Sequence, residues 1–401
     1  MPKVNPEILI WARKTARLTL EEAAQKLGIN QAYGISAIDR LLNMENGKEE
    51  PSRTILKKMS KKYRRSLLVF YLISPPKKSK KVRDFRKLPE SFTNFDKALT
   101  DTLIRKIQIK HSIVHNALLE EDEERTIPFI GSEKINGGVG QLANKIITSL
   151  ELDINTYRKK RAKRDSREYL REKVESAGVF VLYVDNLGNY LSEIPVEAFR
   201  GFALADNLAP FIAVNCNDSI GAQSFTILHE LTHLWLGNTC VGDNSYSEQE
   251  VERFCNQVAS EILLPEGISD LDVVENTSLE EALSEIKYFA DSRNISRSMI
   301  AYRLRSAGNI SNQKYQTITH KFKEEYQIYK QNVRDNRRES SSGGSYFTTR
   351  RHRAGKALVN FVDRMLLGGV ITTTKAGLIL GVSGKNVGNV LWGKANSHER
   401  A

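Results

Sequence analysis

Residues 229 to 233 read His-Glu-Leu-Thr-His, a spacing of side chains that suits metal-dependent hydrolysis. On a helix, His229 and His233 project from the same side, so one zinc ion can bind a nitrogen of each at about 2.0–2.1 Å. Glu230 then lies beside the metal rather than on it, where its carboxylate can take a proton from water. The alternative interpretation is a helix that carries two core or surface histidines and no metal.

A third ligand is predicted on a second helix, nineteen residues after His233. Glu252 there completes three protein donors and leaves the fourth position open for water, as in catalytic zinc sites. Asn256, four residues later, is expected to accept a hydrogen bond from the non-ligating nitrogen of one histidine and to fix its tautomer. This helix is expected to bury one apolar stripe: Val251, Cys255, Val258, Ile262 and Leu263. The competing carboxylates are expected to face solvent: Glu248, Glu250 and Glu261.

Two helices and a small sheet must position these residues. Helical periodicity begins at Ser219 and ends at Gly237, and Pro265 ends the second helix. The segments before them are short apolar runs rich in Val, Ile and Phe, bounded by Asn, Asp, Pro and Gly. They predict strands over 179–186, 199–207 and 210–215. The predicted fold class is therefore α+β, in a mostly helical multidomain chain.

Composition breaks divide the 401 residues into several parts. A basic run with two prolines covers 75–90, and a Ser/Gly/Arg-rich stretch covers 334–345. We expect a basic linker at the first break and a flexible linker at the second. The predicted parts are an N-terminal helical domain (1–75), a basic linker (76–95), a metal-binding domain (96–330, core about 170–312), a second linker (331–345) and a helical C-terminal domain (346–401).

The charge is distributed unevenly along the chain. The net charge is +12 over residues 1–90, −8 over 91–330 and +8 over 331–401. Basic ends suit contact with phosphate groups of DNA, and solvated lysine-rich surfaces are the alternative. No apolar run reaches the roughly 18 residues of a membrane span, and the start of the chain lacks a signal-peptide core. We expect a cytoplasmic protein with no membrane partner.

Three cysteines are spaced too widely for a metal-binding or redox pair: Cys216, Cys240 and Cys255. We expect buried free thiols.

The N-terminal residues 6–72 predict several short helices. Thr19 is placed to cap one of them and Gly28 to end it, while Gly47 and Pro51 separate two more. This segment resembles the Xre-type helix-turn-helix family, which shows a Leu-Thr-x-x-x-x-Ala-x-x-Leu-Gly-Ile run and then a Glu-x-Gly…Pro-Ser turn. The matching positions here are Leu18 to Ile29, then Glu45, Gly47, Pro51 and Ser52.

In that family, the helix after the turn enters the major groove of DNA. The corresponding stretch here is roughly Ala32 to Leu42. Leu41, Leu42 and Met44 make it unusually apolar for a base-reading surface. A domain kept for packing or protein contact is therefore the alternative.

The middle region is similar to glutamate zincins and, more closely, to the ImmA/IrrE family of metallo-endopeptidases. The matching stretches are FRGFAL (199–204), PFIAVN (210–215), SFTILHELTHLWLG (224–237), VERFCNQVASEILLP (251–265) and SRSMIAYRLRSAGNIS (296–311). An Asp-Phe-Arg-x-Leu-Pro stretch, often found between the two domains in this family, is present as Asp84 to Pro89. The family pattern implies zinc bound by His229, His233 and Glu252, with Glu230 as general base. Cys255 and Val258 depart from the pattern, and we expect them to affect packing rather than a ligand.

The resemblance implies peptide-bond hydrolysis. Zinc lowers the pKa of water to about 7, and Glu230 takes the proton and delivers it to the leaving amine. We expect the strand at 210–215 to offer an edge that holds an extended substrate. Candidates for the donor that stabilises the oxyanion are Tyr302, Tyr315 and His320. The remaining histidines are expected to fit no ligand spacing: His111, His115, His352 and His398.

The tail from Tyr346 predicts further helices. Its pattern is that of a second helix-turn-helix with Gly381 at the turn, and a helical cap on the metal-binding domain is the alternative.

Two functions remain open on these grounds. In the first, a zinc endopeptidase cleaves a DNA-binding repressor or regulator, as is typical of the resembled family. In the second, a DNA-binding regulator or antitoxin-like protein uses the metal domain as a sensor. Glu230 favours the first, because a site that only holds metal needs no carboxylate there.

Overall fold

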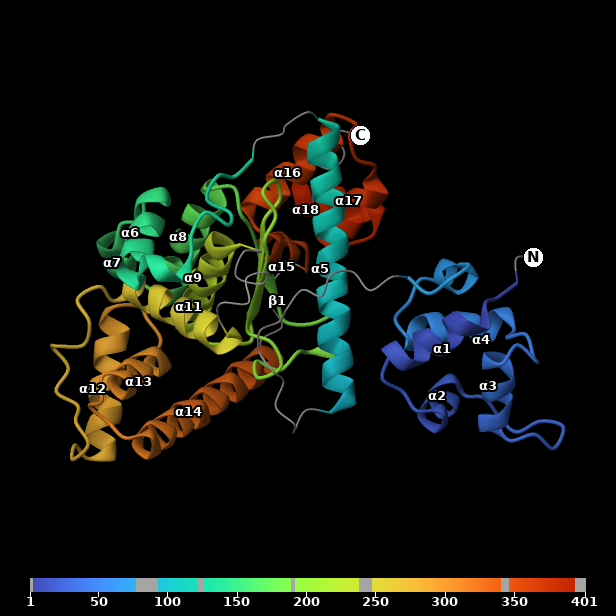
Figure 1. The fold of residues 1–401 in the computed structure, drawn as a ribbon, viewed down its shortest axis with the longest axis horizontal. Helices are drawn as coiled ribbons and strands as arrows, with labels where there is room; N and C mark the ends of the chain where they lie inside the picture. The colour runs from blue at the N-terminus through green and yellow to red at the C-terminus, as the bar shows by residue number, and fades with distance from the viewer. Residues whose placement is uncertain are drawn as a thin grey trace. The chain divides into compact units, whose positions relative to one another are not determined.

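The computed structural model describes residues 3–76, 93–121, 126–188, 192–237, 247–339 and 346–393. The chain divides into two compact units, Met1–Arg105 and Lys106–Ala401. Most described residues are helical, and a three-stranded sheet lies in the second unit (Figure 1), so the predicted α+β class is confirmed. Within the described ranges, no helix combines the length and the apolar character that crossing a bilayer requires.

The first unit contains α1 (Pro6–Thr15), α2 (Leu20–Leu27), α3 (Ala37–Glu45), α4 (Arg53–Lys62), the 3₁₀ helix η1 (Leu67–Tyr71) and the first part of α5 (Asn94–Glu120). Thr19 caps α2 as predicted. Its hydroxyl accepts from the Glu22 amide, and the Glu22 carboxylate accepts from the Thr19 amide. Gly28 ends α2 with φ +61°, a left-handed conformation that glycine adopts without strain.

The stretch predicted to read DNA bases is helical only in its second part. Ala32 and Ile35 exchange two backbone hydrogen bonds across Tyr33 and Gly34, whose φ angles are +53° and +75°. Positive φ at both central residues is the geometry of a tight hairpin turn. The helix therefore begins at Ala37 rather than near Ala32.

The apolar residues of α3 mostly face the core of the first unit. Leu41 and Met44 are buried there, while Leu42 is 38% exposed. The apolar character of this stretch thus reflects packing more than an apolar outer surface.

The sheet of the second unit consists of β1 (Phe180–Val184), β2 (Gly201–Leu204) and β3 (Phe211–Asn215), in the order β1-β3-β2. All three predicted strands are present. β3 pairs with β1 in parallel and with β2 antiparallel, so both of its edges are occupied. The expectation that this strand offers an edge to a substrate is therefore wrong, and β2 is an outer strand.

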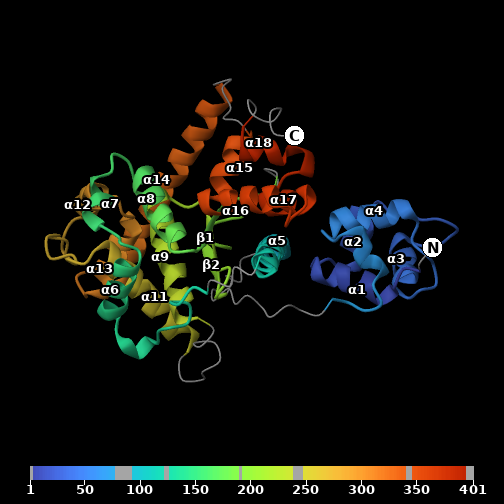
Figure 2. The ribbon, with the colours of Figure 1, turned by 90° about the horizontal axis from the view of Figure 1, so that it is seen from above.

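The helices of the second unit are α6 (Val139–Ser149), α7 (Ile154–Lys159), α8 (Lys163–Ser176), α9 (Ile220–Leu236), α11 (Glu248–Leu263), α12 (Leu279–Ser292), α13 (Arg297–Ser306), α14 (Asn312–Glu339), α15 (Tyr346–Ala354), α16 (Lys356–Leu367), α17 (Thr373–Leu380) and α18 (Val387–Leu391), with the short 3₁₀ helices η2 (Ile135–Gly137) and η4 (Gly384–Asn386). They cover both faces of the sheet: α8, α9 and α11 lie on one side, and α15, α16 and the last part of α5 lie on the other (Figure 2).

Side chains of the strands alternate between these two layers. Val181 and Ile212 join the core that includes Leu231 of α9. The ring of Phe180 faces the opposite layer and packs edge-on against Phe361 of α16, with centroids 5.7 Å apart. Burial of both faces explains why the strands are continuously apolar rather than alternating with polar residues.

The second predicted linker is partly helical. α14 continues to Glu339, so residues 331–339 form helix instead of flexible chain. Arginine and glutamate in this part favour helix, whereas the Ser/Gly run begins only at Ser340. Residues 340–345, and 77–92 of the first predicted linker with Asp84 to Pro89, lie outside the described residues.

The C-terminal helices pack directly on the sheet layer. Arg171 of α8 donates to the carbonyl oxygens of His352 and Arg353 of α15. The Glu175 carboxylate accepts from the Ala357 amide at 3.1 Å. These partly buried polar contacts join α15 and α16 to α8, in the same compact unit as the sheet.

A glycine fixes the end of α9. Gly237 has φ +57°, and a Cβ there would overlap Gly131, whose amide donates to the Leu234 carbonyl. We expect Gly237→Ala to lower the free energy of unfolding by about 2 kcal/mol, because backbone strain and overlap add.

Urea denaturation of Gly308→Ala provides the matched control. Gly308 has φ +81° but nothing within 4 Å of its Cβ position. An equal decrease in the free energy of unfolding in the two variants would show that the contact with Gly131 contributes nothing to stability.

Candidate metal centre

The helix that carries the His-Glu-Leu-Thr-His residues is held on nearly all sides. Ser219 caps α9 by accepting from the Ala222 amide, and Gly237 ends it as predicted. α9 packs on β2 and β3 and against α8 and α11. His229 is 1% exposed and Glu230 is 5% exposed. A helix packed in this way cannot rotate without disrupting the core, so its polar side chains have defined positions.

The second helix is fixed by its cap and its apolar stripe. Ser247 and Glu250 form a reciprocal capping box at the start of α11. The predicted stripe is buried: Val251, Cys255, Val258, Ile262 and Leu263. Because this stripe packs into the core beside α9, the neighbouring Glu252 faces the two histidines.

The structure brings the three predicted ligands together. The Nε2 atoms of His229 and His233 are 3.1 Å apart. Glu252 places Oε2 at 3.4 Å from His229 Nε2 and Oε1 at 3.3 Å from His233 Nε2. Tetrahedral donors at 2.0–2.1 Å from zinc are separated by roughly 3.3 Å, so one ion fits among these atoms.

The charge state of the carboxylate suits a ligand. Burial by itself raises the pKa of Glu252, but the hydrogen bonds and charges of His229 and His233 outweigh burial and hold this pKa well below its ordinary value. Glu252 is therefore an ionised donor.

The general-base candidate lies against the outer strand. A Cβ on Gly201 of β2 would be only 3.0 Å from Glu230 Oε1 and 2.5 Å from Thr226 Cγ2. Glycine at this position thus makes room for the carboxylate beside the strand. The sequence reasoning missed Gly201, although a glycine inside an apolar strand is a signal of close approach.

The competing carboxylates have other roles. Glu250 belongs to the helix cap, Glu248 is exposed at the first turn of α11, and Glu261 lies 3.6 Å from the Arg303 guanidinium. Their positions agree with the expected charged surface.

Cys255 touches a predicted ligand, contrary to expectation. Its Sγ lies 3.6 Å from His233 Nδ1. When Nε2 binds a metal, Nδ1 carries the proton and donates to the sulfur, which fixes the tautomer. Burial raises the pKa of the Cys255 thiol above its ordinary value, so the thiol stays neutral. The role of Asn256, which is partly buried, stays a prediction.

The other cysteines differ in placement. Cys216 is partly buried and free, and Cys240 lies outside the described residues.

The oxyanion candidates have other partners. The Arg305 guanidinium lies over the rings of both Tyr302 and Tyr315. His320 is 70% exposed and pairs with Glu324.

The remaining histidines do not belong to the predicted centre. His352 lies 3.2 Å from Glu168, and His398 is outside the described residues. His111 and His115, for which no ligand spacing was expected, lie one turn apart on α5 and face Asp206. The separation of four residues between His111 and His115 could be recognised in the sequence, but their proximity to the carboxylate of Asp206 could not.

The centre is of the metallopeptidase type. Two helices beside a small sheet present two histidines and one glutamate, and a further glutamate lies next to them. Residues 178–305 match the family model described as the IrrE N-terminal-like domain, a peptidase family. The match covers the sheet, α9 to α12 and nearly all of α13. It supports the ImmA/IrrE resemblance and implies a metal ion. The N-terminal helices lie outside it. No curated protein and no solved structure matches the chain.

The contact between Cys255 and His233 has a measurable consequence. We expect Cys255→Ala to weaken metal binding roughly tenfold, because the imidazole loses the acceptor that orients it. Cys255→Ser should restore most of the affinity. Competition with a chromogenic chelator measures this, and Asn256→Ala is the parallel variant. Unchanged affinity in Cys255→Ala would assign the thiol to packing alone.

Proposed function

We propose that the chain is a zinc-dependent endopeptidase within a regulatory protein, and that it cleaves a DNA-binding repressor or regulator. The observation that carries this proposal is the convergence of three donor residues, whose nitrogen and carboxylate oxygen atoms lie 3.1–3.4 Å apart, beside the buried carboxylate of Glu230. The regulator as substrate rests on the family resemblance.

The residues of the centre would have two roles, metal binding and proton transfer. His229, His233 and Glu252 would hold zinc, and the ion would supply Lewis-acid chemistry toward a peptide carbonyl and water. Glu230 would take a proton from the attacking water and pass it to the leaving amine. Its burial on a packed helix limits its motion, so the carboxylate is already in place for both transfers.

The outer strand is suited to holding the substrate. β2 pairs only with β3 among the described strands, so its other edge carries backbone groups that an extended peptide can pair with. Gly201 of this strand lies beside Glu230. A peptide aligned along β2 therefore passes close to the general base.

The peptidase activity is tested with three versions of the full chain in cells: wild type, Glu230→Gln and Glu248→Gln. We expect new protein N-termini with the wild type and with the exposed-site control Glu248→Gln, and none with Glu230→Gln. Metal content should be the same in all three, since neither substitution removes a ligand. Mass spectrometry of N-terminal peptides is the measurement.

Two outcomes separate the alternatives. Identical N-termini with wild type and Glu230→Gln would refute the peptidase, and bound metal in both would then favour a sensor. A fragment specific to the wild type names the substrate, which Glu230→Gln should retain in a pull-down.

We also propose that the first unit contacts DNA phosphates through α4. Its exposed surface carries five cations: Arg53, Lys57, Lys58, Lys61 and Lys62. On α3, by contrast, Arg40 is already paired with Glu49 at 3.1 Å. Clustered cations on one short helix favour contact with the DNA backbone.

Band-shift assays at several salt concentrations test this, with the chain's own upstream DNA and an unrelated duplex. We expect Lys57→Gln/Lys61→Gln to reduce the slope of log K against log[salt] by about 2, because two phosphate contacts are lost. Absence of any shift by the wild type at low salt would remove the DNA role.

A further inference from the structure

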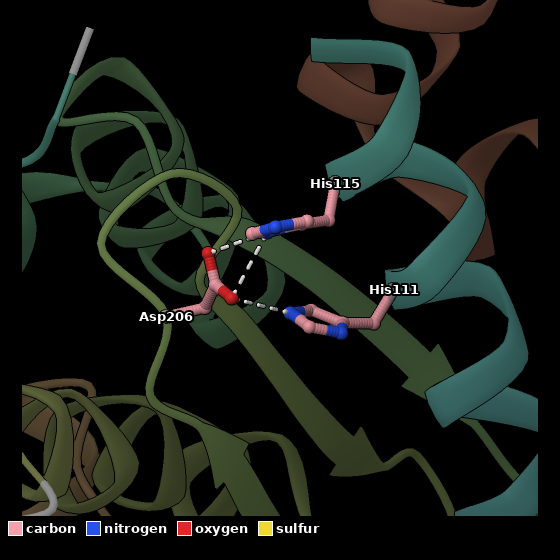
Figure 3. A group of neighbouring side chains, drawn as sticks. All are labelled: His111, His115 and Asp206. Carbon is pink, nitrogen blue, oxygen red and sulfur yellow. Dashed lines mark hydrogen bonds and ion pairs between the residues drawn. The ribbon is translucent and has the colours of Figure 1, made fainter. Parts of the chain in front are cut away.

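We propose that His111, His115 and Asp206 form a second metal site, which binds a divalent transition-metal ion independently of the centre on α9 and α11. The three side chains converge from two elements that are far apart in the sequence (Figure 3). This site uses other residues and other elements than the proposed peptidase centre, and it is tested by a different experiment.

The geometry places three donors around one point. His111 and His115 project from the same side of α5, one turn apart, and Asp206 follows β2. Asp206 Oδ2 lies 3.3 Å from His111 Nε2 and 3.1 Å from His115 Nδ1. All three donors lie within 4.8 Å of one another. Both distances to the carboxylate match the roughly 3.3 Å between donors that share one zinc ion.

The carboxylate is oriented before any ion binds. Asp206 Oδ1 accepts hydrogen bonds from the amides of Leu208 at 2.9 Å and Ala209 at 2.8 Å, and it also lies 3.1 Å from His115 Nδ1. The amides fix the carboxylate with Oδ2 near both imidazoles. An aspartate carboxylate is ordinarily ionised at neutral pH, so the donor is anionic.

One nitrogen of the cluster lacks a proper partner. His111 Nε2 is buried and makes no hydrogen bond of acceptable geometry, although Asp206 Oδ2 is near. A buried polar atom without a partner destabilises the folded state. An ion at the point shared by the three donors satisfies this nitrogen.

The donor set selects the class of ion. Two imidazoles and one carboxylate suit zinc, cobalt, nickel or iron(II), whereas magnesium and calcium prefer oxygen ligands. A cavity of about 450 Å³ adjoins His115 and Asp206, with Leu119, Thr126 and Leu208 in its lining. It has room for water molecules that complete the coordination.

The site differs from the first centre in one respect that bears on its role. Ser112 follows His111, at the position that corresponds to Glu230, and its hydroxyl donates to the Gln108 carbonyl. Because a serine rather than a carboxylate follows the first histidine, we infer that an ion here links the two segments and does not catalyse hydrolysis. It joins α5 to the segment after β2, 91 residues away from His115 in the sequence.

The experiment counts metal in the full chain after chelator stripping and dialysis against zinc or cobalt. We expect about two equivalents in the wild type, one in Asp206→Asn, one in His233→Gln and none in the combined variant. Asn keeps an oxygen that accepts the two amides and loses the charge, so the loop geometry is preserved. His320→Ala, which removes an exposed histidine elsewhere, should retain two equivalents.

A stability measurement gives an independent readout. Because an ion that binds only the folded state stabilises it, zinc should raise the melting temperature of His233→Gln but not of the combined variant. Circular dichroism checks folding, and His111→Gln/His115→Gln replaces Asp206→Asn if the latter does not fold. One equivalent in the wild type, or two in Asp206→Asn, would overturn the second site. Metal counts do not depend on proteolysis. The second site can therefore be confirmed or refuted even if the peptidase proposal fails.

Discussion

The packing of α9 between the sheet and the helices α8 and α11 is the constraint on which the first centre depends. The side chains of His229 and Glu230 are buried on this helix, which costs free energy unless they find partners. Because α9 is enclosed, His229 and His233 cannot turn toward solvent, and Glu252 of α11 is the charge that meets them. A bound cation offsets the cost of burying these groups, and the rigidity of the core keeps the donor atoms close to the spacing that zinc requires.

The same arrangement of three donor residues occurs twice among the described residues of the second unit. A pair of histidines four residues apart presents two nitrogens on one side of a helix, and a carboxylate from another element supplies the third donor. The two differ in what stands next to the first histidine: Glu230 on α9 and Ser112 on α5. In the two proposals made above, that difference separates a centre with a candidate general base from one that would only hold an ion. The carboxylates also differ, since Asp206 is oriented by backbone amides whereas Glu252 is oriented by the packing of α11.

Much of the local structure was predictable because it follows from short-range chemistry. The caps at Thr19 and Ser219 and the ends at Gly28 and Gly237 lie where side-chain acceptors and glycine conformations place them. The three strands were recognisable as apolar runs. Their order was not, since pairing depends on which strand returns to which neighbour, and the strand expected at an edge is central. The helix through Glu339 shows the reverse case, where local helix propensity outweighed a linker-like composition.

By itself, the sequence determined the periodic part of the site: His229 and His233 share a helix face, and Glu252 has the right phase on the next helix, because 3.6 residues per turn are a property of the backbone. Only the tertiary structure decided contacts between elements. It placed the Cys255 sulfur at His233 Nδ1, and it brought Gly201 against Glu230. It also set Asp206 opposite His111 and His115. Such contacts join residues whose separation along the chain carries no periodic signal, so they follow from how the layers pack.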